Sequence, residues 1–187
     1  AIIDAAQAAP SSIGGQQVTI IAISNKEAKE KLAEFAGGQN YIAHAPLFLL
    51  FCADFYLAAI ACEINGVEMK AQQSIESIMV GSVDVGISLG FAMAAAESMG
   101  LGTVTIGAIR AHAREVAKLV ELPKNVFPVA GLLIGHAADW SKLKPRLPRK
   151  AVFHEKVYSR DLRPMIEQYH IDCYWYVDQC GGEPHTW

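Results

Sequence analysis

The stretch VFPVAGLLIG at residues 126–135 is followed closely by LKPRLP at residues 143–148. The first stretch is an almost uninterrupted apolar run, which predicts a buried strand. In the second stretch, two prolines keep the backbone extended, and residues two apart in an extended chain project to the same side. Lys144 and Arg146 therefore predict a rigid pair of cations suited to an anion such as phosphate, with a solvated basic loop as the alternative.

Further elements extend outward from this strand. Apolar and β-branched runs predict strands at 18–24, 46–53 and 103–106, with a short edge strand at 151–154. Apolar residues at helical spacing predict helices at 1–9, from Asn25, at 69–100 with a break near Gly81, at 114–120 and at 161–176. This order fits either a doubly wound parallel sheet or an α+β sheet wrapped by helices.

The composition is that of a globular domain. The 187 residues are 52% hydrophobic with a formal net charge of −3, which excludes a disordered chain and gives no global field for nucleic acid or an anionic membrane. Asp84 and Glu97 interrupt the most apolar stretch, 78–99, so no membrane span of about 20 residues is expected. Four cysteines without a CxxC pair indicate a reducing, cytoplasmic setting.

The central part of the long helix, 78–99, is almost uncharged on every side. Such a helix is typically buried inside the molecule or against a subunit. The first residues, AIIDAA, have the pattern of the middle of a helix without an N-cap. We therefore expect the natural protein to have further segments at both ends.

Common motifs for nucleotide binding, nucleophilic catalysis and zinc binding are absent from the sequence. It has no GxGxxG, no GxSxG and no HExxH, and its glycine spacing at 102–107 lacks the Lys-Ser/Thr of a P-loop. The six histidines lie far apart in the sequence, so no metal site is expected. Three loops are candidates for ligand contacts, at 10–16, 36–42 and 100–110, and each also fits an ordinary turn, helix end or strand end.

Four segments occur together and in one order: PSSIGGQQ at 10–17, AGGQNYI at 36–42, AAESMGLGTVTIGAIR at 95–110, and FPVAGLLIGHAAD with LKPRLP, followed by His154-Glu155. In this combination the chain resembles the FMN-dependent nitroreductase and flavin-reductase family. Within the family it is most similar to the oxygen-insensitive, NADPH-preferring branch. The resemblance covers roughly residues 1–160, and KPRLP after the apolar strand is its most specific part.

The resemblance implies an α+β fold, with a mainly antiparallel central sheet surrounded by helices, in an intertwined homodimer that has helix 78–99 in its interface. It implies one FMN-binding domain over 1–187, expected to lack the family's N-terminal HRSxRxF-type segment and part of a C-terminal extension. Two FMN sites would be built across the subunit interface. The implied cofactor-binding residues are Ser11, Ser12, Gln16, Gln39, Ile106, Gly107, Lys144 and Arg146, with Tyr41 and Arg110 assigned to the nicotinamide or the substrate.

The implied activity is ping-pong two-electron reduction of nitroaromatics, quinones or flavins, with NADPH or NADH as the donor. The flavin carries the chemistry, so no catalytic side chain is required. Expected partners are a second copy of the chain and small-molecule oxidants, with no nucleic acid and no membrane. Two alternatives stay open: a flavin enzyme of another reaction, such as dehalogenation or flavin fragmentation, and a flavin-free or catalytically silent dimeric binding protein of the same fold.

Three departures from the family pattern bear on these expectations. Ala108 stands where a glycine is often found, and Thr105 stands where an aromatic residue is common. Residues 176–187 contain no Lys or Arg, so the basic loop expected to hold the 2′-phosphate of NADPH is not recognisable there. The choice between NADPH and NADH therefore stays open.

Overall fold

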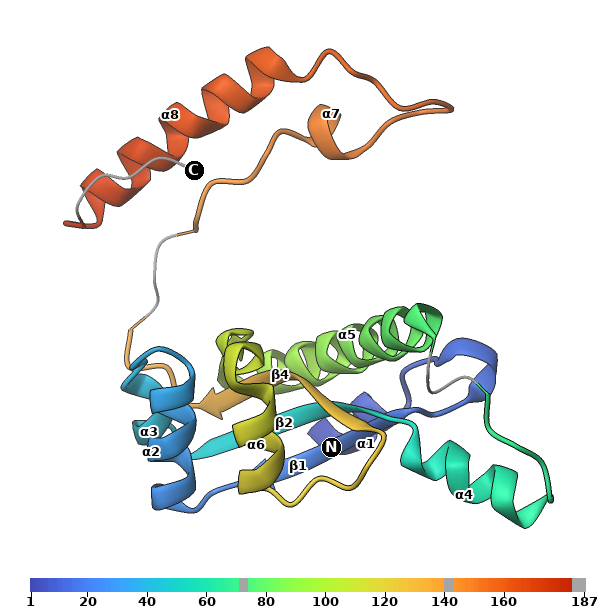
Figure 1. Ribbon diagram of the computed structural model, residues 1–187. Coiled ribbons are helices and arrows are strands. Elements are labelled where there is room, and N and C mark those ends of the chain that lie inside the picture. The colour runs from blue at the N-terminus through green and yellow to red at the C-terminus, as the bar shows by residue number, and fades with distance from the viewer. Residues whose placement is uncertain (71–73, 140–142, 183–187) are drawn as a thin grey trace. The chain divides into compact units, whose positions relative to one another are not determined.

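Four strands form one antiparallel sheet within residues 1–138 of this computed structural model, which describes residues 1–70, 74–139 and 143–182 (Figure 1). The strands are β1 (Val18–Ile23), β2 (Leu47–Asp54), β3 (Gly102–Ile106) and β4 (Val126–Gly135). They are ordered β1-β2-β4-β3, and every pairing is antiparallel. The α+β architecture is therefore confirmed, and the parallel, doubly wound alternative is wrong.

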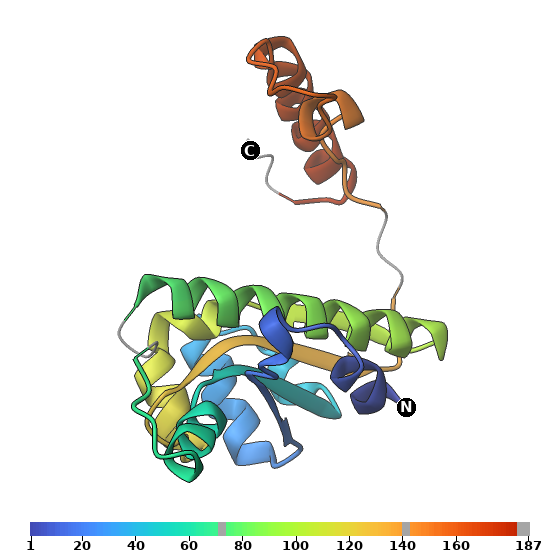
Figure 2. The same cartoon turned by 90° about the vertical axis from the view of Figure 1, so that its right-hand side faces the viewer.

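Side chains of β2 alternate between two hydrophobic clusters, one on each face of the sheet. Phe48, Leu50 and Cys52 belong to the cluster of the first face. That face is covered by α2 (Lys26–Phe35), α3 (Tyr41–His44), the 3-10 helix η3 (Ala108–His112) and α6 (Ala113–Leu119). The intervening residues of β2 point to the second face, which α1 (Ile2–Gln7) and α5 (Ile75–Ser98) cover (Figures 1 and 2).

The ends of α2 follow the expected local chemistry. The side-chain oxygen of Asn25 accepts a hydrogen bond from the backbone N–H of Ala28 at 2.9 Å, as an N-cap does. At the other end, Gly37 and Gly38 both have positive φ, which glycine adopts without a steric penalty. The N–H of Gly38 donates to the carbonyl of Ala33 at 2.9 Å and so closes the helix.

Helix α5 is continuous from Ile75 to Ser98, so the break expected near Gly81 is wrong. A Cβ atom at Gly81 would lie 2.8 Å from the Cβ of Ala53 and 3.0 Å from Cε2 of Phe55. The glycine therefore allows the helix to approach β2 closely. The helix begins later than expected, after the cap residue Ser74, and positions 71–73 of the expected helix lie outside the described residues.

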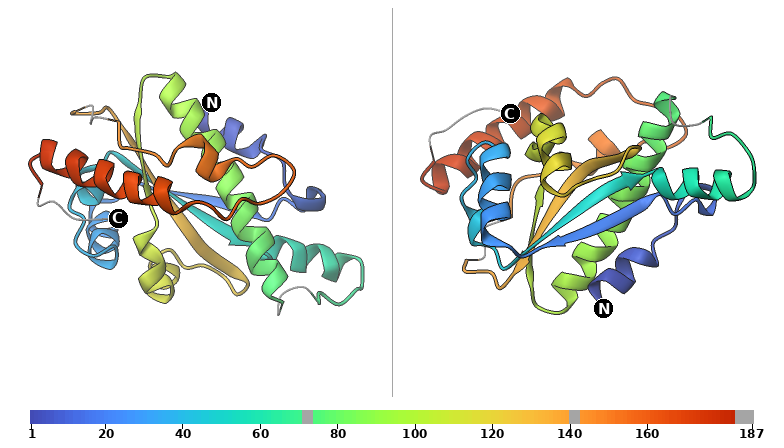
Figure 3. Two further views of the ribbon diagram at one scale, coloured as in Figure 1. Left: turned by 90° about the horizontal axis from the view of Figure 1, so that it is seen from above. Right: turned by 60° about the horizontal axis from the view of Figure 1, so that its bottom comes forward.

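The buried stripe of α5 consists of small or polar residues: Ser77, Gly81, Asp84, Val85, Ser88, Ala92 and Ala96. Five of its bulky apolar side chains are exposed, namely Ile75, Ile78, Met79, Val83 and Phe91, whereas Leu89 and Met93 pack partly buried against the sheet. By length and composition alone α5 could cross a membrane, since an 18-residue window has a mean hydropathy of 1.7. The sequence argument from Asp84 and Glu97 therefore does not exclude a span. A core helix passes the same test, and α5 lies across the strands of the sheet (Figure 3).

Two α-helices of the first 138 residues were not expected from the sequence, the short α3 and the longer α4 (Tyr56–Ile64). Helix α4 follows β2 and has no buried residue (Figure 1). Its apolar sequence, YLAAIACEI, closely follows the apolar run of β2, and Asp54 between the two runs is the signal of a helix start. Asp54, the last residue of β2, accepts hydrogen bonds from the N–H groups of Tyr56 at 2.9 Å and Leu57 at 3.3 Å and so begins the helix.

Residues 139–187 form a second compact unit, whose described part is considered by itself. The edge strand expected at 151–154 is wrong, because a short helix, α7 (Arg149–Val152), lies there after Pro148. The N–H of Ala151 donates to the carbonyl of Pro148 at 2.8 Å, and the Arg149 guanidinium stacks on the Phe153 ring. The expected C-terminal helix is confirmed as α8 (Arg163–Gln179).

Candidate functional site

The loop at 10–16 connects α1 to β1. Ile13 and Gln16 both have left-handed backbone angles, with φ of 51° and 49°, and the Ile13 side chain is fully exposed. Ser11 Oγ accepts a hydrogen bond from the N–H of Gln16 at 3.0 Å. The N–H of Ser12 donates to both carboxylate oxygens of Asp84, each at 3.1 Å. The loop thus holds a hydroxyl and an amide side chain on an unusual backbone turn that is anchored to α5.

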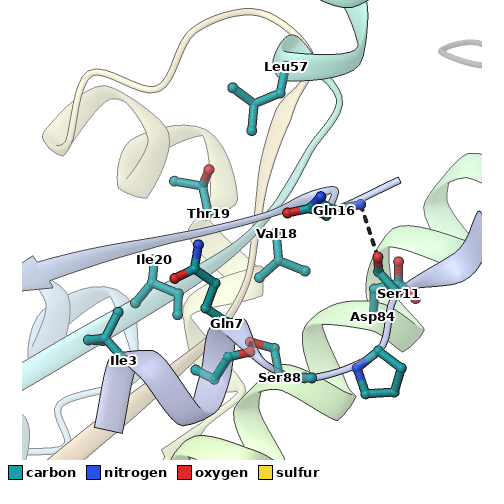
Figure 4. Close-up of a pocket in the computed structure, with 13 residues that line it drawn as sticks. Ile3, Gln7, Ser11, Gln16, Val18, Thr19, Ile20, Leu57, Asp84 and Ser88 are labelled. Carbon is teal, nitrogen blue, oxygen red and sulfur yellow. Dashed lines mark hydrogen bonds between the residues drawn. The ribbon is translucent and has the colours of Figure 1, made fainter. Parts of the chain in front are cut away.

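A pocket of about 420 Å³ opens beside this loop, between α1, β1 and α5 (Figure 4). Ser11 and Gln16 line it near Asp84, while Ile3 and Ile20 lie toward the other end (Figure 4). Six of its thirteen lining residues are polar, so the pocket offers hydrogen-bonding groups beside its apolar walls.

Gln39 and Tyr41 lie together directly after α2. Gln39 Nε2 donates to the carbonyl of Ala36 at 2.8 Å, and its Oε1 accepts a hydrogen bond from the Tyr41 hydroxyl. Tyr41 is exposed and Gln39 is half-buried. The amide is therefore oriented by its own segment, and its second N–H hydrogen is not used by these contacts.

Ile106 and Gly107 join the end of β3 to η3 on the first face. The Ile106 side chain is buried in the core, so this residue can offer its backbone to a ligand. A Cβ atom at Gly107 would lie 3.0 Å from Nη2 of Arg110, which places the guanidinium directly beside the glycine. Nη1 of Arg110 donates to the carbonyl of Val129 at 2.7 Å. Val129 has no partner on β2, because the pairing of β2 with β4 shifts by one residue at this point. Arg110 therefore binds a carbonyl at a β-bulge.

Lys144 and Arg146 are both exposed and belong to the second unit. Residues 143–148 have no helix or strand assignment, as the two prolines predict. Nη1 of Arg146 donates to the carbonyls of Lys144 and Pro145, each at 3.1 Å. The guanidinium thus turns back on its own segment, which leaves its other N–H groups outside these two contacts.

Within residues 1–138 the residues implied for the cofactor, the nicotinamide or the substrate fall into two groups. Ser11, Ser12 and Gln16 belong to the loop that α5 anchors on the second face. Gln39, Tyr41, Gly107 and Arg110 belong to segments of the first face, where the Phe35 and His112 rings stack at 5.7 Å between centroids. The sheet lies between the two groups, so one chain does not bring all of these residues around a single planar ligand.

Sequence reasoning missed the role of Asp84, which it treated only as an interruption of an apolar stretch. The structure shows a carboxylate that is 3% exposed and that binds a loop 72 residues away in the sequence. The signal was present, since buried charges are costly and a lone Asp in an apolar helix requires a hydrogen-bonding partner. What the sequence did not indicate is which segment supplies that partner.

The titratable groups with shifted pKa values lie outside both groups of candidate residues. Burial, with a smaller effect of the Asp54 charge, raises the pKa of the Cys52 thiol to about 12. This thiol is therefore neutral at physiological pH and is a core residue, because the thiolate is the nucleophile. In α8 a hydrogen bond to Cys173 is the main cause that raises the pKa of Tyr169, while desolvation raises the pKa of Tyr176.

Comparisons with known proteins give a consistent result. A family model described as Nitroreductase family matches residues 1–136. A Bacillus subtilis protein named "FMN reductase [NAD(P)H]" is 51% identical over 191 residues, which cover all of this chain and 77% of that protein. The oxygen-insensitive NADPH nitroreductase of Salmonella typhimurium is 42% identical over 160 residues, which cover 85% of this chain and 64% of the relative. The solved structure of B. megaterium NfrA2 is 50% identical in sequence and has a TM-score of 0.96. The match covers all of this chain and 76% of the NfrA2 chain.

Proposed function

The chain belongs to the nitroreductase family, and from that premise we propose that it is an NAD(P)H-dependent flavin oxidoreductase that reduces small-molecule oxidants through FMN. The observation that carries this function is the 51% identity over the whole chain to a protein named for NAD(P)H-dependent FMN reduction. A shared fold alone would not be sufficient, because one fold serves many functions. Here the match covers the whole chain and therefore spans every candidate segment from residue 10 to residue 148.

The residues present fit FMN by their chemistry. Lys144 and Arg146 are exposed cations on a proline-flanked segment, and such a pair suits the phosphate. The Gln39 amide both donates and accepts, which suits the polar edge of the flavin ring. Gly107 has no side chain between its backbone and a ligand, and Ile106 beside it is buried. We assign Ser11, Ser12 and Gln16 to the same cofactor. When bound, FMN supplies the two-electron transfer between the nicotinamide and the oxidant.

We propose that each FMN site takes residues from two copies of the chain. The separation of the candidate residues by the sheet supports this arrangement, because a second copy can supply one group while the first copy supplies the other. The outward side of α5 supports it too, since its bulky apolar residues are exposed in a single chain. A stable homodimer of this kind is expected to bury more than about 2,000 Å².

The roles of the side chains follow from charge and position. Lys144 and Arg146 hold the phosphate, and Gln39 with nearby backbone N–H groups binds the ring edge where negative charge develops on reduction. Arg110 presents its remaining N–H groups toward the nicotinamide nucleotide or the substrate, and Tyr41 lies on the same face. We propose nitroaromatics, quinones and flavins as oxidants, NADPH or NADH as donor, and the cytoplasm as the location. The four cysteines are all unpaired, which supports a reducing compartment.

The decisive experiment adds FMN to the purified protein and records flavin absorbance near about 450 nm, followed by oxidation of NADH or NADPH with a nitroaromatic or quinone acceptor. We expect a bound flavin and turnover of the acceptor. A protein that stays colourless after FMN addition would favour the flavin-free alternative. A protein that binds flavin but turns over neither acceptor would favour a flavin enzyme of another reaction.

Replacing Lys144 and Arg146 together by Ala tests the phosphate site. Each charged hydrogen bond contributes about 1.5–3 kcal/mol, so we expect the Kd for FMN to rise by at least about 100-fold. The matched control is Arg149→Ala with Lys150→Ala, which removes the same charge from exposed neighbours and should change the Kd by less than about threefold. An unchanged Kd in the first variant would contradict the assignment.

A further inference from the structure

We propose that Asp84 is a positioning residue for the cofactor site: its buried carboxylate holds the loop at 10–16 in the conformation that contacts FMN. This inference rests on the proposed function, because it assumes that Ser11, Ser12 and Gln16 contact the flavin. It goes further by assigning a role to a residue of α5 that touches the loop backbone and is not among the residues assigned to the cofactor. The contact joins two segments that are 72 residues apart in the sequence.

One backbone N–H serves both oxygens of the carboxylate. Both carboxylate oxygens of Asp84 lie 3.1 Å from the backbone nitrogen of Ser12, so the N–H points between them. A hydrogen bond to an ionised group is stronger than one between neutral groups. The side chain of Ser12 stays exposed, and the hydroxyl of Ser11 is used to hold the N–H of Gln16 at 3.0 Å. The carboxylate thus fixes the backbone of the loop and leaves its side chains presented outward.

The position of Asp84 is costly for the fold. The residue is 3% exposed in a helix whose apolar window has a mean hydropathy of 1.7. The ion pairs found among residues 1–70, 74–139 and 143–182 do not include it. Burying a charge without a cation is unfavourable, and an apolar residue of similar volume is often at least as stable in such a place. A role in the site gives a reason for the charge that stability does not.

The loop itself has backbone strain that needs such an anchor. Ile13 is a β-branched residue with φ of 51°, a conformation that costs free energy for any residue other than glycine. The other hydrogen bonds of the loop are local, from the N–H of Gly14 to the carbonyl of Ser11 at 3.1 Å and from that of Gly15 to Ser12 at 2.8 Å. These local hydrogen bonds define the shape of the turn, whereas the hydrogen bond to Asp84 fixes the position of the loop against α5.

One helical turn further on, α5 supplies a natural control. Ser88 is also buried, and its hydroxyl donates to the carbonyl of Ala6 in α1 at 2.9 Å. Both side chains therefore bind the backbone of the N-terminal segment from the same side of α5. Asp84 holds the candidate loop, and Ser88 holds the preceding helix. Loss of Ser88 should weaken packing and leave the loop conformation intact.

The test compares Asp84→Leu, Asp84→Asn and Ser88→Ala with the unchanged protein in three measurements. These are the Kd for FMN, the thermal midpoint without FMN, and hydrogen exchange of the peptide 10–17 without FMN, read by mass spectrometry. For Asp84→Leu we expect a Kd at least tenfold higher and loop exchange at least tenfold faster, with a thermal midpoint that is equal or higher. Asp84→Asn keeps a carbonyl acceptor without the charge and should recover part of the FMN affinity. Ser88→Ala should lower the thermal midpoint and leave loop exchange unchanged, because Ser88 bonds to α1 and not to the loop.

Each contrary outcome has a distinct meaning. If the unchanged protein binds FMN and Asp84→Leu binds it equally well, the inference is overturned and the proposed function stands. If FMN affinity and the thermal midpoint fall together in both Asp84 variants, Asp84 is a residue of the fold, and the inference is again overturned. If the unchanged protein does not bind FMN, the proposed function fails and the inference fails with it.

Discussion

The two faces of the sheet are covered in opposite ways. On the first face, bulky side chains of the strands meet bulky side chains of α2, α3, η3 and α6, among them Leu32, Ile42 and Ile109. On the second face, α5 meets the strands with Ala92, Ala96 and other mostly small residues, together with Leu89 and Met93, and several other bulky side chains of the helix are exposed. The hydrophobic core on the first face is therefore formed entirely by residues of one chain. The second face positions a helix whose outer side is suited to a further layer, and the candidate cofactor residues are divided between the two.

The largest effect on stability is expected from the first face. Phe48 is fully buried, and its ring lies so close over Gly131 that a Cβ atom there would be 2.2 Å from Cζ. Phe48→Ala should lower the free energy of unfolding by about 3–5 kcal/mol, because it removes a large side chain and leaves a cavity. Denaturant unfolding at one protein concentration measures this loss. Phe127→Ala, at a half-exposed ring of β4, is the control and should cost less than half as much.

A smaller loss is expected where α5 approaches the second face. Gly81→Ala places a Cβ atom 2.8 Å from the Cβ of Ala53, and such overpacking costs about 1–3 kcal/mol. The better helix propensity of Ala returns up to about 1 kcal/mol, so the net loss should be at most about 2 kcal/mol. Ser82→Ala, at the next position of the helix, has a similar change in propensity without that contact. A stabilised Gly81→Ala protein would show that α5 and β2 are not packed as closely as described.

Much of this comparison could be predicted from local sequence, and some of it could not. The strand at 126–135 and the cap at Asn25 were predicted correctly, because apolar runs and capping side chains act over a few residues. The prediction of a strand at 151–154 was wrong, because the apolar residues of this segment suit a short helix as well as a strand. The turn residues of the candidate site were identifiable in the same local way.

What local sequence does not contain is the pairing of distant segments. The division of Ser11 and Gln39 between two faces depends on the strand order and register, which no single motif encodes. The same holds for the bond between Ser12 and Asp84, and for Gly81, which suggested a helix break until its neighbour Ala53 was known. A glycine or a buried charge indicates that something lies close by, whereas identifying the neighbour requires the fold.

Substitutions on the outer side of α5 should have the smallest effect on the stability of the single chain. They are also the most informative test of how the two faces differ. Met79 and Val83 are 58% and 59% exposed in the single chain, so changing both to Lys should alter its intrinsic stability by about 0.5 kcal/mol or less. If a second copy covers this side, the two buried charges should convert a dimer into a monomer in sedimentation equilibrium. Glu30→Lys on α2 changes the net charge by the same amount and should leave the dimer intact. A monomer before any substitution, or a dimer that persists after both, would mean that the outer side of α5 is not the interface.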